Sequence, residues 1–190
     1  MKALAARLVS VIAHPFILSA GSTLISADAH HASPSLFKVL VLVLVVLGGI
    51  AIGFALWHVL TGRWKHLDAV EPSERIVLNG FLATLLLISS ALAWRYFPEP
   101  ELACGLLVSG SAIVIALLIS PWLKISLHAC FAAIATGILW PASYAFLAGA
   151  VFSVAAYWSR LVLRRHSVNE LAVGSVVGIV CAMGYHALTR

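Results

Sequence analysis

The sequence of 190 residues is 62% apolar and only 10% charged, and its mean hydropathy is +1.05. This composition excludes a water-soluble globular domain and indicates an integral membrane protein. The formal net charge of +5 comes from residues beside the apolar segments, so it points to lipid headgroups and not to a nucleic-acid partner. We expect a single membrane domain over residues 1–190.

The N-terminal segment, residues 1–35, is apolar but interrupted. Lys2 and Arg7 precede its apolar run, and Ala27-Asp28-Ala29 has the A-x-A form of a signal-peptidase site. His14-Pro15 breaks the run near its middle, which favours a kinked or interfacial helix over a plain secretion signal. We therefore expect this segment to be retained, either spanning the bilayer or lying along its surface.

Six further apolar segments each approach the roughly 20 residues that cross a bilayer core. Their apolar runs are continuous and do not alternate with polar residues, which favours helices over a barrel. The predicted spans are residues 36–60, 76–94, 102–120, about 127–142, 144–163 and 169–187. The expected fold is all-α, a multi-pass transmembrane bundle with a six-helix core at 36–187 and the N-terminal segment added to it.

If the segments cross in turn, the cations gather on one side of the membrane. The side that holds the N-terminus also receives the loops at 61–75, 121–126 and 159–168. Nine of the 12 Lys and Arg residues lie there, namely Lys2, Arg7, Arg63, Lys65, Arg75, Lys124, Arg160, Arg164 and Arg165. The positive-inside rule would make this side cytoplasmic, unless some of these cations bind an anionic substrate. In either case, polar loops from separate parts of the chain are expected to meet at one membrane face.

The loop at 121–126 leads into a helix through the sequence K-I-S-L-H. Lys124, Ser126 and His128 occupy alternate positions in it. Backbone N–H groups at a helix N-terminus attract an anion, and a lysine and a hydroxyl add to that attraction. This stretch predicts an anion-binding site with a histidine beside it.

The loop at 159–168 carries a second set of spaced polar residues, Arg160, His166 and Glu170. If the segment is helical, four residues place His166 and Glu170 on one face, where the carboxylate takes one imidazole N–H and makes the other nitrogen a better nucleophile or base. Two histidines with cations at one membrane face suit attack on a phosphate. One imidazole attacks, the other protonates the leaving oxygen, and the cations hold the phosphoryl charge.

These motifs resemble the signatures of the type 2 phosphatidic acid phosphatase (PAP2) superfamily, over roughly residues 36–187. One signature, S-R-x5-H-x3-D, is similar to a stretch of this chain that has Ser159-Arg160, then five residues, His166, three residues and Glu170. Ile125-Ser126-Leu127-His128 stands where the family has P-S-G-H, and Arg75 where it has the arginine of K-x6-R-P. The resemblance implies hydrolysis of a lipid phosphomonoester or pyrophosphate without metal or cofactor, through a phosphohistidine intermediate, in a cell membrane such as the bacterial inner membrane.

The resemblance also implies a role for each matching residue. His166 corresponds to the nucleophile, Glu170 to the acid that orients it, and His128 to the general acid. The positions that correspond to phosphate ligands are Arg75, Ser126 and Arg160. Asp68 stands in the place of the family's lysine, so Lys124 or Lys65 would supply the missing cation.

Departures from the family pattern leave two other functions open. Besides Asp68, Ile76 replaces a proline and Glu170 replaces an aspartate. A catalytically inactive relative that binds anionic lipid would tolerate these changes, and a lipid phosphotransferase would use the same site. The remaining polar residues are interpreted as interfacial, loop or headgroup-anchoring residues, namely His14, His30, His31, His58, His66, His186, Arg164 and Arg165.

Overall fold

The computed structural model describes residues 2–29, 34–67, 69, 71–98 and 100–189, and these ranges contain helices and no strands. The helices are α1 (Lys2–Ile12), α2 (Pro15–Ala29), α3 (Pro34–Leu60), α4 (Pro72–Tyr96), α5 (Pro100–Ile119), α6 (Leu127–Ile138), α7 (Ser143–Val162) and α8 (Val168–Leu188). The predicted all-α class is confirmed. Asp68, His30 and His31 lie outside the described residues.

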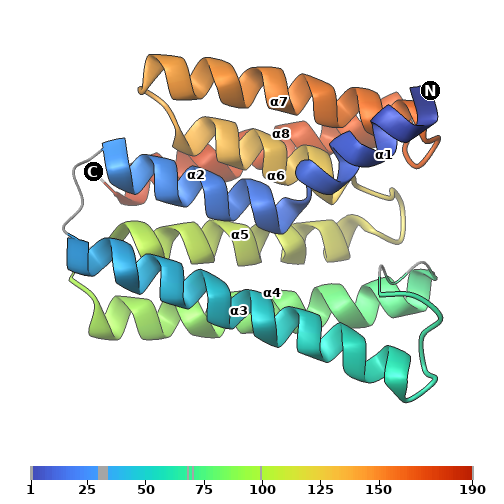
Figure 1. The fold of residues 1–190 in the computed structure, drawn as a ribbon, viewed down its shortest axis with the longest axis horizontal. Coiled ribbons are helices and arrows are strands. Elements are labelled where there is room, and N and C mark those ends of the chain that lie inside the picture. Colours follow the sequence, from blue (N-terminus) through green and yellow to red (C-terminus); the bar gives the residue numbers. More distant parts are fainter. Residues whose placement is uncertain (1, 30–33, 68, 70, 99, 190) are drawn as a thin grey trace.

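Within these ranges, the helices α3, α4, α5, α7 and α8 are long and apolar enough to cross a membrane. The helices α1 and α2 pass the same test as a pair, with a bend of 53° between them. The break falls at His14-Pro15, as predicted, because proline has no N–H to continue the helix. Since α1 packs on α7 and α2 packs on α6 and α3, the N-terminal pair runs along the bundle and does not lie flat across its end (Figure 1).

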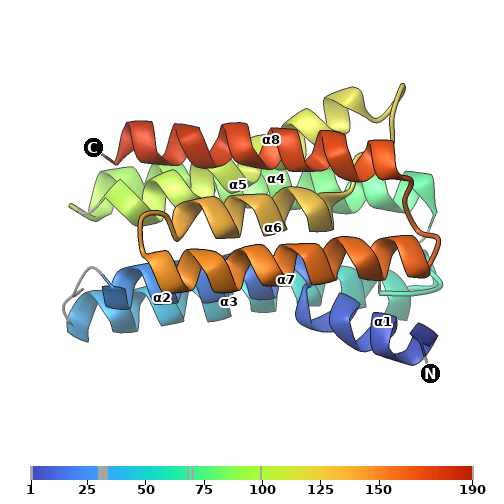
Figure 2. The ribbon, with the colours of Figure 1, turned by 90° about the horizontal axis from the view of Figure 1, so that it is seen from above.

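The helix α6 is shorter than its predicted span, because it ends at Ile138 and not near residue 142. Leu139 forms the C-cap, and Pro141 follows shortly after, where a helix cannot continue. At 12 residues, α6 falls short of the length of about 20 that crosses a bilayer. Most of its residues are buried, with α2, α7 and α8 packed around it (Figures 1 and 2). A helix enclosed by protein does not need to reach either membrane surface.

The helices α6 and α8 approach closely because α8 has glycines where they meet. A Cβ atom on Gly174 would lie 2.7 Å from the carbonyl oxygen of Ser126, and one on Gly178 would lie 2.3 Å from that of Cys130. The two glycines are four residues apart and form one stripe, a common way for membrane helices to pack. This contact sets the N-terminus of α6 against the first turns of α8.

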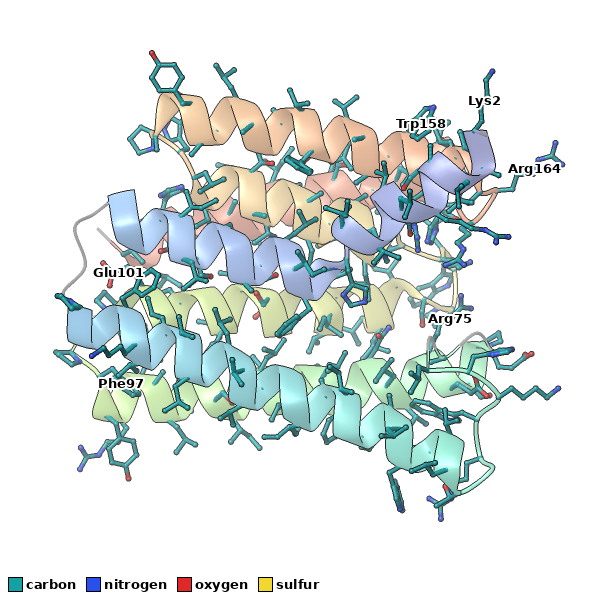
Figure 3. The ribbon with its side chains drawn as sticks, viewed as in Figure 1. Lys2, Arg75, Phe97, Glu101, Trp158 and Arg164 are labelled. Carbon is teal, nitrogen blue, oxygen red and sulfur yellow. The ribbon has the colours of Figure 1, made fainter. Side chains whose placement is uncertain are left out.

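The links between helices alternate between the two ends of the bundle. The start of α1 lies at the same end as the α3–α4, α5–α6 and α7–α8 links, and the end of α8 lies at the other (Figure 1). Arg75 and Arg164 also lie at the first end, whereas Glu101 lies at the opposite one (Figure 3). We call the first end, with Lys2, Arg75, Lys124 and Arg164, the basic end. The loops that were predicted to meet thus lie together at one end of the bundle (Figure 1).

An aromatic cluster joins α3, α4 and their link at the basic end. The ring of His58 stacks on Trp64 with centroids 4.2 Å apart, and its Nδ1 lies 3.0 Å from the carbonyl oxygen of Phe54. Phe54 in turn stacks on Phe81 of α4 at 3.8 Å. The cluster holds the start of the α3–α4 link, which leads to Arg75.

Candidate active site

The predicted site residues lie at the basic end, on three separate parts of the chain. Their charges influence one another. Burial lowers the pKa of Lys124, and the charges of Arg75, Arg160 and Arg165 lower it further, while Glu170 opposes this. Because such effects fade with distance, the structure brings together charges that are widely separated in sequence.

A sharp reversal of the chain links α7 to α8. Arg164 has a positive φ of 50°, and the N–H groups of Arg164 and Arg165 donate to the carbonyl oxygens of Leu161 and Arg160. This is the Schellman arrangement of a helix end, in which glycine usually takes the left-handed position. The reversal turns the chain back at the end of α7, so that His166 follows Arg160 after one compact turn.

His166 and Glu170 form the best-defined contact of the site. His166 Nδ1 lies 2.8 Å from Glu170 Oε2. The contact does not arise from a shared helix face, since His166 precedes α8 and Ser167 is the N-cap. Glu170 Oε2 also accepts the Ser167 N–H at 3.2 Å, and the Ser167 hydroxyl accepts the Glu170 N–H at 3.3 Å. A capping box therefore holds the carboxylate against the imidazole.

The surroundings of His166 favour a neutral imidazole. Burial lowers the pKa of His166, whereas the hydrogen bond with Glu170 raises it. The positive charges of Lys124 and Arg160 lower the pKa further. The ring is therefore neutral at pH 7. When its Nδ1–H donates to Glu170, the lone pair resides on Nε2, the form that a nucleophile requires.

His128 is half-buried in the first turn of α6, outside the helices of spanning length. Burial lowers its pKa to about 2, and the nearby Arg160, His14, His166 and Arg165 contribute in the same direction. The site thus holds a neutral imidazole in a positive field. A phosphate dianion would counter that field and favour the imidazolium, the form that donates a proton.

Arg160 reaches the site from the last turn of α7 and is only 6% exposed. Its Nη1 donates to the hydroxyl of Ser10 on α1. A guanidinium presents several N–H donors in one plane, which matches the oxygens of a phosphate. The arginine is therefore held in place by the N-terminal helix, beside both histidines.

Ser126 and Lys124 have structural partners in the α5–α6 link. Ser126 is fully buried as the N-cap of α6, where its hydroxyl accepts the Ala129 N–H at 3.5 Å. Its own N–H donates to the Glu170 carbonyl at 3.3 Å, and Lys124 Nζ donates to the Arg165 carbonyl at 3.2 Å. These bonds tie the two links together. Because its side chain is covered, Ser126 as a phosphate ligand stays a prediction.

Arg75 lies half-buried in the first turn of α4. The acidic residues before it have a local task, since Glu71 and Glu74 form a capping box in which the Glu71 N–H donates to Glu74 Oε2 at 3.3 Å. This cap fixes the start of the helix that presents Arg75. Asp68, at the position of the family's lysine, belongs to the residues that the structure does not describe.

Ser10 and His14, from the N-terminal segment, lie beside the site although the sequence predicted neither there. The ring centroids of His14 and His128 are 5.7 Å apart in an edge-to-face arrangement, and Ser10 accepts from Arg160. The polar break at His14-Pro15 was the available signal. It predicted a kink, but hydropathy does not tell where a kink docks.

Nitrogen groups dominate the site, and its carboxylate Glu170 is engaged with His166. Over the ranges that the structure describes, no three His, Cys, Asp or Glu side chains are grouped so as to hold a metal ion. His186 lies elsewhere, with Nε2 2.8 Å from the Gly137 carbonyl oxygen, which agrees with its interpretation as a structural residue. Chemically, the arrangement can attract an anion, and its two imidazoles are groups that can act as a nucleophile and as a proton donor.

Comparisons with known proteins add no relative to this picture. No family model, no characterised protein and no solved structure matches the chain. The resemblance to the PAP2 superfamily therefore stays a prediction that rests on the three motifs.

Proposed function

We propose that this protein is an integral membrane lipid phosphatase that hydrolyses a lipid phosphomonoester or pyrophosphate through a phosphohistidine. The observation that carries the proposal is the 2.8 Å contact between His166 Nδ1 and Glu170 Oε2. A neutral imidazole oriented by a carboxylate is an established design for a nucleophile or base. The neighbouring His128 and Arg160 supply the other two requirements of phosphoryl transfer, a proton donor and a fixed positive charge.

In the first half-reaction, Nε2 of His166 forms a bond to phosphorus while the bond from phosphorus to the lipid oxygen breaks. His128, protonated in the presence of the dianion, donates its proton to that oxygen. The lipid alcohol then leaves from a phosphomonoester, or the lipid monophosphate from a pyrophosphate. Arg160, Arg75 and Lys124 hold the negative charge of the phosphoryl oxygens. Glu170 stabilises the positive charge that develops on the His166 ring.

In the second half-reaction, water attacks the phosphohistidine. His128 accepts a proton from this water, the bond between phosphorus and His166 breaks, and inorganic phosphate leaves. His166 returns to its neutral form with Nδ1 facing Glu170. The same group thus acts first as acid and then as base, as the two halves of a displacement at one phosphorus require.

The test is phosphate release by protein purified in detergent, with EDTA present. The substrates are phosphatidic acid, phosphatidylglycerophosphate and a polyprenyl pyrophosphate. We expect release by the wild type and a loss of at least about 1,000-fold in His166→Ala and in His128→Ala. His186→Ala is the matched control, because His186 lies at the opposite end against Gly137 and should leave the rate unchanged.

Two outcomes would contradict the proposal. If the wild type binds lipid phosphates but releases phosphate from none of them, the protein is a binder of anionic lipid. If His166→Ala retains release, another group is the nucleophile. A phosphate on nitrogen that is lost in acid, trapped on the wild type and absent from His166→Ala, would support the intermediate directly.

A further inference from the structure

The break between α1 and α2 is packed firmly against the bundle. Ala13 at the break is 1% exposed and packs with Ala132 of α6 and Ala156 of α7, which are 1% and 0% exposed. Small side chains allow close approach of the backbones. The break is therefore held by α6 and α7, the helices that carry His128 and Arg160.

A polar stripe follows α1 from the basic end to this break. Arg7 and Ser10 lie three residues apart on α1, the spacing that places side chains on one side of a helix, and His14 follows at the break, after α1 has ended at Ile12. Arg7 and His14 are exposed, and Ser10 accepts the hydrogen bond of Arg160. In an otherwise apolar segment, these polar residues lead along α1 from the basic end to the site.

His14 ends the stripe next to His128. Its ring is exposed, the ring of His128 is half-buried, and the two centroids are 5.7 Å apart. His14 Nδ1 accepts the N–H of Phe16 at 3.3 Å, so the neutral ring carries its proton on Nε2. An exposed imidazole, that of His14, therefore lies next to a half-buried one, that of His128, and both can bind a proton.

We propose that His14 is the proton relay of His128, loading it when the lipid phosphate binds and unloading it when phosphate leaves. This proposal rests on the proposed function of the site. The groups that face His128 are Arg160 on α7, His166 and Arg165 on the α7–α8 link, and His14 itself. They keep the imidazole neutral until an anion arrives, so each substrate requires the delivery of one proton.

Over one turnover, His14 and His128 take up and release the same number of protons. An imidazolium at His14, formed by uptake from water or buffer, passes one proton to His128, and His128 gives it to the leaving lipid oxygen. His128 then takes a proton from the attacking water. After phosphate has left, that proton returns through His14 to water or buffer, and no further reactant takes part.

The test compares the wild type with His14→Asn in dilute buffer, measuring kcat and KM for phosphate release and then adding free imidazole. Asparagine keeps an acceptor for the Phe16 N–H but carries no proton between pH 5 and 8. We expect kcat to fall by about 10-fold or more, KM to stay close to that of the wild type, and imidazole to restore kcat. His66→Asn, an exposed histidine in the α3–α4 link, is the control and should behave like the wild type.

A structural role would give a different pattern. An unchanged kcat in His14→Asn, or a loss that imidazole does not restore, overturns the relay. If thermal unfolding shows that His14→Asn is not folded, His14→Gln is measured in the same way. A wild type that is inactive on every lipid phosphate contradicts the proposed function and the relay together, whereas an active wild type with an unaffected His14→Asn contradicts the relay alone.

Discussion

Glu170 serves two partners with one carboxylate oxygen. Oε2 accepts the N–H of Ser167 and contacts Nδ1 of His166. The PAP2 pattern has an aspartate here, whereas this chain has the longer glutamate. Glutamate is preferred at the third position of a helix with a serine N-cap, because its side chain reaches back to the N–H of the cap residue. The departure from the family pattern therefore has a local structural reason that keeps the charge beside the imidazole.

At the residue scale, Glu170→Gln tests whether that charge matters. Glutamine retains the size of the side chain and an acceptor for the Ser167 N–H, but it does not stabilise a positive His166 ring. We expect phosphate release to fall by about 10-fold to 100-fold with the fold intact. The measurement is the release rate beside thermal unfolding. Glu101→Gln, at the opposite end (Figure 3), is the control, and equal rates for both variants would contradict the role of Glu170.

At the scale of the elements, the contact of α6 with α8 sets the distance between the two halves of the site. His128 belongs to α6, whereas His166 directly precedes the N-cap of α8 and Glu170 lies in its first turn. The Ser126 N–H bonds the Glu170 carbonyl across the contact, and Gly174 and Gly178 allow it. Any side chain added there must push the helices apart, because backbone carbonyls occupy the space.

Gly178→Ala and Gly184→Ala make a matched pair for this contact. A Cβ on Gly178 would lie 2.3 Å from the Cys130 carbonyl oxygen, whereas nothing lies within 4 Å of one on Gly184. We expect Gly178→Ala to destabilise the protein by about 2 kcal/mol, lowering Tm by roughly 4–8 °C. Gly184→Ala should be neutral or stabilising, because alanine favours a helix. Equal Tm values in detergent for the two variants would rule out the close contact.

At the scale of the whole molecule, the fold surrounds its two site histidines with positively charged residues. Residues from the α5–α6 link, α7 and the α7–α8 link all depress the pKa of His128 or His166, in addition to burial. Both imidazoles are thus neutral in the folded protein at a pH where histidines of the unfolded chain begin to bind protons. The stability of the fold therefore depends on pH.

The direction of this dependence follows from the depressed pKa values. The pKa of His128 is about 2 in the folded protein, and about 6.5 is usual for an unfolded chain. The unfolded state binds the proton first as pH falls, so the contribution is complete above about pH 6.5 and declines below it. When the pH falls from about 7.5 to about 5.5, His128 should lower the free energy of unfolding by an amount on the order of 1 kcal/mol. His166 should lower it as well, because its pKa is shifted in the same direction.

Thermal unfolding in detergent at the two pH values measures this effect. The wild type should have a lower Tm at the lower pH. His128→Asn removes one of the two groups, so its Tm should change less between the same pH values. A pH shift as large in His128→Asn as in the wild type would show that His128 is not the source.

The sequence by itself determined those features that depend on nearby residues or on hydropathy alone. Continuous apolar runs predicted the helical bundle, and their alternation brought the cations to one end. The sequence also predicted that His166 contacts Glu170, but through a shared helix face, whereas a capping box at the start of α8 makes the contact. Only the tertiary structure decided that α6 is short and enclosed, that Ser126 is a covered cap, and that His14 docks beside His128. The contacts of His14 with His128 and of Ser10 with Arg160 join segments more than 100 residues apart, and Ser126 is covered where α6 packs on α8. Hydropathy records how apolar a segment is, but it does not record which neighbour that segment will touch.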